Sequence, residues 1–461
     1  MFSAQIYSNR RKNLLSMVAK GLILIPGNHE APCNYKGNTY RYRQDSTFSY
    51  FFGIDEPNLL GLIDVDENRQ YLIGDNLEIE DIIWMGLQPS MTEKASSVGI
   101  TQVLSHNDFQ AYLSNAISKK RSIHFTSPYR AENAALLQNL LKISGRELDA
   151  TISMELTKAI VSLRSVKSTE EIFEIEQMVD VAWIMHTTAM KIARQGTTER
   201  KIAGIIEGIA LSHGKGVSFP VILSMNGETL HNHNHGNVLQ NGRLLLTDAG
   251  AESELLYASD ITRTVPVGGK FEARQKDIYN IVLQANLKAI DMLSPKRKYL
   301  DIHLEVSRVI ASGLVDLGLM QGNIDDIVHA GAHALFFPHG LGHMLGLDVH
   351  DMENLGEDNV GYDNTVSRSS QFGLAYLRFA RKPLPGYVLT DEPGIYFISA
   401  LIDLWRSEKK FTEFINYDKL EAYKNFGGIR IEDDLLVTED GCRVLGKPIP
   451  KTVEEIEGIM G

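Results

Sequence analysis

The chain has 461 residues and a formal net charge of −12, with 43% hydrophobic and 23% charged residues. This length exceeds what one hydrophobic core usually serves, so we expect two domains, and the composition is ordinary for a globular protein. The acidic excess argues against nucleic acid and anionic lipid as partners, because no lysine- or arginine-rich stripe offsets it.

The cysteines and the start of the chain predict a cellular compartment. Cys33 and Cys442 are the only two cysteines and lie far apart, which indicates free thiols rather than a disulfide framework or a cysteine zinc site. Near the start, Lys20 interrupts a short apolar run that ends at Pro26-Gly27. This run is too broken for a secretory signal and too short to cross a bilayer. We therefore expect a cytoplasmic protein with no membrane partner.

Residues 1–165 alternate short apolar runs with helical stretches, which is typical of an α/β domain with a mostly parallel or mixed sheet. The expected strands are 21–27, 59–66 and 121–127, and an expected helix is 133–143.

Residues 166–461 are expected to form the second domain. Ser168 followed by Glu171 is a capping box, which predicts the start of a helix that Gly196 ends. The expected helices are 168–194, 198–212, 274–294 and 300–318. The expected strands are 219–225, 243–250 and 387–397. The order helix, helix, strands occurs twice, so we expect two related halves.

Four carboxylates lie in segments that are otherwise apolar, namely Asp248, Asp260, Glu392 and Glu432. Any one of them alone is most simply an acid that caps a loop at a strand end. Together in one apolar site they would repel each other and lose hydration, which demands a counter-charge. Oxygen donors with a histidine and no cysteine favour manganese or another octahedral divalent ion. Two such metals, about 3.5–4 Å apart, would acidify a bridging water for hydrolysis of a polarised carbonyl.

The histidine donor of such a metal site is expected from the segment FFPHGLGHMLGLDVHD, which contains His339, His343 and His350. The four-residue spacing of the first two would fit one face of a helix. However, each glycine in a helix interior costs roughly 1 kcal/mol, and this segment has three glycines and a proline. We therefore expect extended chain here.

These segments resemble the pita-bread metallopeptidases, specifically the branch of Xaa-Pro aminopeptidases and prolidases. The segments that carry the resemblance are LLLTDAGAESELLYASDITRTVPVGGKF, FFPHGLGHMLGLDVHD, VLTDEPGIYF and FGGIRIEDDLLVTEDG. The stretch YRYRQDSTFSYFFGIDEP resembles the non-catalytic domain of that branch. The resemblance implies a smaller amino-terminal α/β domain, 1–165, and an α+β pita-bread catalytic domain, 166–461, with pseudo-twofold halves.

The resemblance also implies five metal ligands. Asp248 would chelate one of two divalent ions, most simply Mn²⁺, and His343 would bind the other. Asp260 and Glu432 would bridge them. Glu392 would ligate the His343 metal and carry the proton of the bridging water to the leaving amine.

Other residues are implied as helpers around the metals. His339 and His350 would hydrogen-bond the substrate, and Arg430 would orient a carboxylate ligand. A further helper is expected from LHNHNHG, with His231, His233 and His235 as candidates, of which His231 fits best by distance ahead of Asp248. Asp391 stands where the family usually has a small or apolar residue. It is expected to point the opposite way along its strand and is not counted as a ligand.

The activity implied is exopeptidase cleavage between an N-terminal residue and a following proline, on peptides or on dipeptides, by a homodimer. Arg378 could grip the substrate carboxylate, which would favour a prolidase, or it could be structural. Methionine aminopeptidases share the ligand types but normally lack the leading domain, and creatinase-like relatives lack the full ligand set. A peptide-binding relative without metals is the alternative from another class. The histidines expected only to pack or to lie at the surface are His29, His106, His124, His186, His213, His303, His329 and His333.

Overall fold

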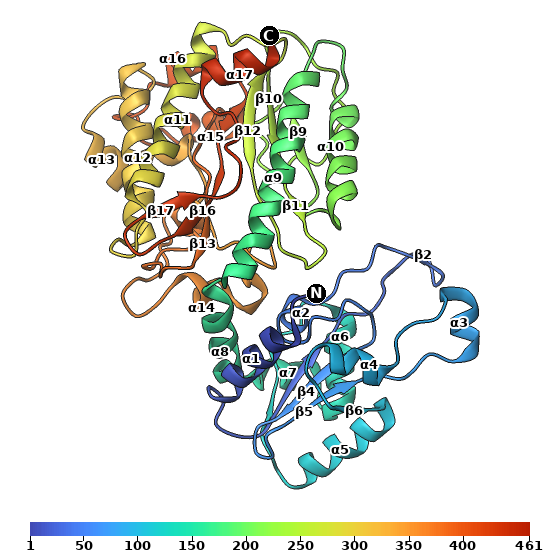
Figure 1. The fold of residues 1–461 in the computed structure, drawn as a ribbon. Helices are drawn as coiled ribbons and strands as arrows, with labels where there is room; N and C mark the ends of the chain where they lie inside the picture. The colour runs from blue at the N-terminus through green and yellow to red at the C-terminus, as the bar shows by residue number, and fades with distance from the viewer. The chain divides into compact units, whose positions relative to one another are not determined.

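The computed structural model describes all residues, 1–461. The chain divides into two compact units, which Figure 1 draws as ribbons. Unit 1 comprises Met1–Arg164 together with Met352–Asn359, and unit 2 comprises Ser165–Asp351 together with Val360–Gly461. None of the helices combines the length and the apolar composition that a membrane span requires.

A five-stranded sheet in the order β6-β5-β4-β1-β7 forms the centre of unit 1. Its strands are β1 (Leu22–Pro26), β4 (Leu60–Asp64), β5 (Arg69–Ile73), β6 (Gln102–Leu104) and β7 (Ile123–His124). Strand β1 pairs antiparallel with β4 and parallel with β7, so the sheet is mixed, as expected. The strands predicted at 21–27, 59–66 and 121–127 are confirmed as β1, β4 and β7.

Helices pack against this sheet and bury its apolar side chains, among them Leu24 and Leu62 of the strands and Phe109 and Leu113 of α5. The helices of this part of the chain are α1 (Ala4–Leu15), α2 (Ser46–Phe52), α3 (Ile79–Met85), α4 (Met91–Ser97), α5 (His106–Ser118), α6 (Ala131–Leu141), α7 (Gly145–Ala150) and α8 (Met154–Ser165). Helix α3 does not pack on the sheet, because none of its residues is buried. A separate hairpin consists of β2 (Pro32–Tyr35) and β3 (Asn38–Thr39). The helix predicted at 133–143 is α6.

Four long helices frame unit 2, and they are α9 (Thr169–Ile192), α10 (Glu199–His213), α11 (Ala273–Met292) and α12 (Tyr299–Asp316). Each confirms a predicted helix to within a few residues. The hydroxyl of Ser168 accepts the backbone N–H of Glu171, so the expected capping box opens α9. The shorter helices of the later chain are α13 (Ile324–Ala330), α14 (Glu357–Gly361), α15 (Ser399–Ser407), α16 (Tyr417–Leu420) and α17 (Val453–Met460). Helix α14 crosses the boundary between the units, since unit 1 includes the chain up to Asn359.

The strands of unit 2 form two sets, each preceded in the chain by two long helices. The first set is β8 (Gly216–Val217), β9 (Ile222–Ser224), β10 (Leu244–Asp248), β11 (Ala251–Glu252) and β12 (Thr262–Pro266). The second set is β13 (Val388–Asp391), β14 (Gly394–Tyr396), β15 (Gly428–Arg430), β16 (Asp433–Val437) and β17 (Cys442–Val444). Helices α9 and α10 lie on one side of these strands and α11 and α12 on the other (Figure 1). The repeated order agrees with two related halves.

Candidate metal centre

Two of the expected acids lie at neighbouring strand ends in the first half of unit 2. All five residues of β10 are buried, and Asp248 is its last residue. Strand β10 lies between β9 and β12, and its register pairs Asp248 with Thr262. Asp260 stands two residues before β12. The loop between them folds closely, because a side chain at Gly250 would place its Cβ 1.7 Å from the carbonyl oxygen of Ser259.

The other two acids lie at the ends of a strand pair in the second half. Strands β13 and β16 pair antiparallel, and their register places Asp391 opposite Asp433. Glu392 follows Asp391, and Glu432 precedes Asp433, so each glutamate is the chain neighbour of one residue of that pair. Successive side chains of an extended strand point to opposite faces. The glutamates therefore share one face, and the two aspartates share the other.

The segment around His343 is not helical and lies alongside β13, which confirms extended chain. The backbone N–H of Thr390 donates to the carbonyl of His343 at 2.9 Å, and that of Glu392 donates to Leu341 at 2.8 Å. Gly342 permits this approach, since its Cβ would lie 2.1 Å from the Thr390 carbonyl oxygen. The His343 Nδ1 lies 3.0 Å from the carbonyl of Met344 and must donate its proton there. The other ring nitrogen, Nε2, is thereby left as a lone-pair donor.

Donor atoms from both halves converge on this nitrogen. The His343 Nε2 lies 3.4 Å from Oδ2 of Asp260 and 3.8 Å from Oε1 of Glu392. Ligand atoms of Asp260, His343 and Glu432 all lie within 4.8 Å of one another, and all three residues are buried. Asp248 is 7% exposed. It lies close enough to Asp260 for its negative charge to raise the pKa of that residue. The structure thus brings together the five residues that the sequence predicts.

The cluster is electrostatically unfavourable on its own. Burial raises the pKa of Asp260, and the charge of Asp248 raises it further. Burial and the charge of Asp260 likewise raise the pKa of Glu432. Burial raises the pKa of Glu392 to about 8, although Arg430 acts in the opposite direction. Carboxylates so placed need positive charge, which a divalent cation supplies.

The hydrogen bonding of Asp248 indicates whether these donor atoms fit a cation. Its Oδ2 accepts a 2.6 Å bond from Nη2 of Arg430, while its Oδ1 is buried and has no hydrogen-bond partner. A buried carboxylate oxygen without a partner is costly, so this atom needs a ligand. Hard oxygen donors with one imidazole nitrogen fit a divalent metal ion.

Arg430 links the acids to two residues that the sequence analysis did not single out. Besides Asp248, its guanidinium donates to the hydroxyl of Thr262 at 3.0 Å and to that of Tyr396 at 2.9 Å. The Thr262 hydroxyl in turn donates to Oε2 of Glu432 at 2.7 Å. Strand alternation could have revealed Thr262, which stands two residues after Asp260. Nothing local points to Tyr396.

The predicted helper histidines lie around the acids. His339 donates from Nδ1 to the carbonyl of Gly340 at 2.8 Å and accepts at Nε2 from the Tyr396 hydroxyl at 2.9 Å. Burial and the charge of Arg430 lower the pKa of His339 to about 3, so its ring is neutral. The ring of His350 meets that of His343 edge-on, with 4.3 Å between centroids.

The remaining candidates, His231, His235 and Arg378, differ in their charged and polar neighbours. Burial lowers the pKa of His231, and so does the charge of Arg430, while Asp248 raises it, so His231 lies within electrostatic range of both residues. The Nε2 of His235 instead lies 3.1 Å from the carbonyl of Val221. The charge of Arg378 also lowers the pKa values of His231, His339 and Glu392, so Arg378 is close to the centre.

Two of the histidines expected to pack are buried near the centre. Burial lowers the pKa of His186 to about 4, and its Nε2 lies 3.0 Å from the carbonyl of Ala249, beside Asp248. Burial lowers the pKa of His303 to about 3, and its ring lies 5.3 Å from that of Phe337. Neither histidine belongs to the metal-ligand cluster.

Comparison with known proteins agrees with this geometry. Residues 174–439 match metallopeptidase family M24, and residues 7–124 match the aminopeptidase P, N-terminal domain. The Xaa-Pro dipeptidase of Homo sapiens is 32% identical over 461 residues, covering 98% of this chain and 90% of that protein. A probable Xaa-Pro aminopeptidase of Aspergillus fumigatus is 31% identical over 467 residues, covering 99% of this chain and 94% of its own length.

Among solved structures, zinc-substituted Escherichia coli aminopeptidase P in complex with product superposes with a TM-score of 0.82 at 30% identity, covering 100% of this chain and 98% of that one. These likenesses, the buried donor cluster and the unpartnered Asp248 oxygen together support a divalent metal centre. Because the family match spans more than half of the chain and full-length relatives exceed 30% identity, the chain belongs to metallopeptidase family M24.

Proposed function

We propose that the protein is an exopeptidase that depends on two divalent metal ions and hydrolyses the bond between an N-terminal residue and a following proline. The observation that carries the proposal is the convergence of Asp260, His343 and Glu432 beside Asp248, whose Oδ1 is buried without a partner. The names of full-length relatives, Xaa-Pro aminopeptidase and Xaa-Pro dipeptidase, support the substrate class.

The acids and His343 would hold the two metals. Asp248 would chelate one ion and His343 the other, with Asp260 and Glu432 shared between them and Glu392 on the His343 ion. When bound, such ions would polarise the scissile carbonyl and bring the pKa of a coordinated water close to neutral. The hard donor set supports Mn²⁺ as the physiological metal.

The protein groups would move protons and bind the substrate. Glu392 would take the proton of the attacking water and give it to the proline nitrogen, which is a basic leaving group. Its buried carboxyl, with a pKa raised to about 8, supports this role, because a group that titrates near neutral pH can both take and give a proton. His231, His339 and His350 would hydrogen-bond the substrate and its developing oxyanion. Arg430 would hold Asp248 in place through their 2.6 Å bond.

Substrate length separates two candidate functions. The charge of Arg378 acts on His231, His339 and Glu392, so a guanidinium near the centre could bind the carboxylate of a dipeptide. This observation favours a dipeptidase. The structural likeness to aminopeptidase P favours an enzyme that also accepts longer peptides, and we propose the aminopeptidase with the dipeptidase as the second candidate.

The deciding experiment compares Ala-Pro with Ala-Pro-Ala in the presence of Mn²⁺, with Ala-Ala as the control peptide and Glu392→Gln as the control enzyme. Rapid cleavage of the tripeptide supports the aminopeptidase, and cleavage of Ala-Pro alone supports the dipeptidase. If neither peptide is cleaved and the purified protein holds no stoichiometric metal, the proposal fails, and a peptide-binding protein without metals is the alternative to test.

We also propose the setting of this activity. The functional domains would be 1–165 and 166–461, which the family matches at 7–124 and 174–439 support. The free thiols of Cys33 and Cys442 support a cytoplasmic location. A homodimer rests on the resemblance to the family, and sedimentation velocity tests it directly.

A further inference from the structure

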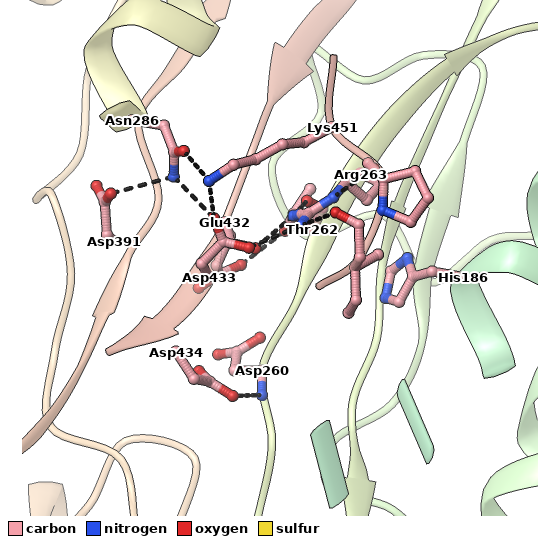
Figure 2. A network of polar contacts seen from close by, with 12 residues as sticks. His186, Asp260, Thr262, Arg263, Asn286, Asp391, Glu432, Asp433, Asp434 and Lys451 are labelled. Atoms are coloured by element: carbon pink, nitrogen blue, oxygen red, sulfur yellow. Dashed lines mark hydrogen bonds and ion pairs between the residues drawn. The ribbon is translucent and has the colours of Figure 1, made fainter. Parts of the chain in front are cut away.

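A second, buried polar cluster adjoins the candidate metal ligands, and Figure 2 draws it together with Asp260 and Glu432. It begins with Asp391 and Asp433, which face each other across β13 and β16 and are 0% and 2% exposed. Each is the chain neighbour of a candidate ligand, Glu392 or Glu432.

Two carboxylates directly opposite each other in a buried strand pair destabilise the pair unless other groups compensate. Asp433 receives one cation on each oxygen. Arg263 donates from Nη2 to its Oδ1 at 2.7 Å, and Lys451 donates from Nζ to its Oδ2 at 2.6 Å. Figure 2 shows the ends of Lys451 and Arg263 both directed toward this aspartate.

Asn286 of α11 connects the two aspartates. Its Nδ2 donates to Oδ2 of Asp391 at 3.1 Å and to Oδ2 of Asp433 at 3.3 Å. Its Oδ1 accepts a 2.7 Å bond from Nζ of Lys451. Lys451 therefore fixes the orientation of the amide that joins the two strands, and it does so without contacting Glu392 or Glu432.

Lys451 is itself held firmly in place. The hydroxyl of Tyr279 donates to its carbonyl at 2.8 Å, and Nε of Arg263 donates to the carbonyl of Pro450 at 3.0 Å. Helix α17 begins two residues later with the capping box of Thr452 and Glu455. The segment before the last helix is thus tied to the strand that follows Asp260.

We propose that Lys451, together with Asn286, is a positioning residue for the metal centre. By joining Asp391 to Asp433, the pair keeps β13 and β16 in the register that presents Glu392 and Glu432 to the same metals. The inference rests on the proposed function, because it takes these glutamates as ligands. It adds Lys451, a residue that lies beyond the matched family region 174–439.

The test is the affinity of metal-free protein for Mn²⁺, measured by competition with a fluorescent chelator, together with the thermal unfolding midpoint. Lys451→Met keeps the aliphatic stem and removes the charge, and Lys451→Arg keeps the charge. The matched control is Arg121→Met in unit 1. The side chain of Arg121 is 19% exposed and pairs with Asp64 at 0%, while that of Lys451 is 18% exposed and pairs with Asp433 at 3%.

We expect Lys451→Met to weaken Mn²⁺ binding about 10- to 100-fold, as the loss of a group that orients a ligand does. Lys451→Arg should stay within a few-fold of wild type, and Arg121→Met should bind Mn²⁺ normally even if its midpoint falls. The inference is overturned if folded Lys451→Met binds Mn²⁺ like wild type, or if Lys451→Arg is as weak as Lys451→Met. If Lys451→Met does not fold, Asn286→Ala replaces it under the same criteria. Wild-type protein that binds no Mn²⁺ would instead refute the proposed function.

Discussion

Replacing Arg430 by glutamine tests the electrostatic account of the metal centre. Arg430 is 3% exposed and its guanidinium makes three side-chain bonds, to Asp248, Thr262 and Tyr396. Burial opposes its charge, yet Tyr396, Asp248 and the glutamates raise its pKa, so it remains a cation. Glutamine is neutral and cannot reproduce the fork of the guanidinium.

Breaking a buried ion pair by removing one partner typically costs about 3–5 kcal/mol, because the other charge is left uncompensated. We expect this loss in the unfolding free energy of metal-free Arg430→Gln. Tyr396→Phe, which removes only the hydroxyl between Arg430 and His339, should cost about 1 kcal/mol.

The assay is urea unfolding in the presence of a chelator, followed by tryptophan fluorescence. Trp183 and Trp405 both lie in unit 2 and report on the unit that contains the cluster. A loss below about 1 kcal/mol for Arg430→Gln, or a loss no larger than that of Tyr396→Phe, would refute the view that Arg430 neutralises Asp248.

Three further predictions follow from the same structure. Glu392→Gln should fold normally, with an unchanged circular dichroism spectrum, and should lower kcat for Ala-Pro-Ala by about 100- to 10,000-fold, as loss of a general acid–base does; turnover close to wild type would remove Glu392 from proton transfer. Arg378→Ala should raise KM for Ala-Pro by about 10- to 100-fold if its guanidinium binds the carboxylate, since hydrogen bonds to charged groups contribute about 1.5–3 kcal/mol; an unchanged KM would make Arg378 structural. Burial lowers the pKa of His303 to about 3, so below about pH 6.5 the folded state binds fewer protons than the unfolded chain. The unfolding free energy therefore keeps its full value above about pH 6.5 and decreases as the pH falls toward 3. His303→Gln should therefore reduce the slope of the unfolding free energy against pH between about pH 6.5 and pH 5, where the native histidine contributes a loss of up to about 1.4 kcal/mol per pH unit. Equal slopes for the two proteins would contradict this prediction.

Local signals in the sequence were sufficient for the elements whose apolar pattern matches their burial. Helix α9 is predicted because a capping box begins it. Strand β10 is predicted because a continuous run of leucines is typical of a strand that is buried on both faces. Helix α1 has no such pattern, since two of its buried residues are Arg10 and Arg11. The guanidinium of Arg11 donates to the carbonyls of Phe51 and Val98, each at 2.6 Å, so a polar residue occupies an interior position.

The residues of the metal centre also fall into those that the sequence could reveal and those that it could not. Its acids could be found because each stands in an otherwise apolar segment at or beside a strand end, and an unpaired acid there requires an explanation. Tyr396 and Lys451 could not be found, because each contributes through a contact that depends on how distant segments fold together. The Nζ of Lys451 meets the side chain of Asn286 across 165 residues of chain, and no local periodicity encodes such a contact.

The wide separation of the cluster's residues also constrains biosynthesis. Arg430 and Asp248 stand 182 positions apart, and Glu432 follows still later. A nascent chain on the ribosome therefore exposes Asp248 and Asp260 long before the final carboxylate emerges. The complete set of proposed ligands therefore exists only after the chain has been made through Glu432, so a metal bound by all of them would be captured after that point.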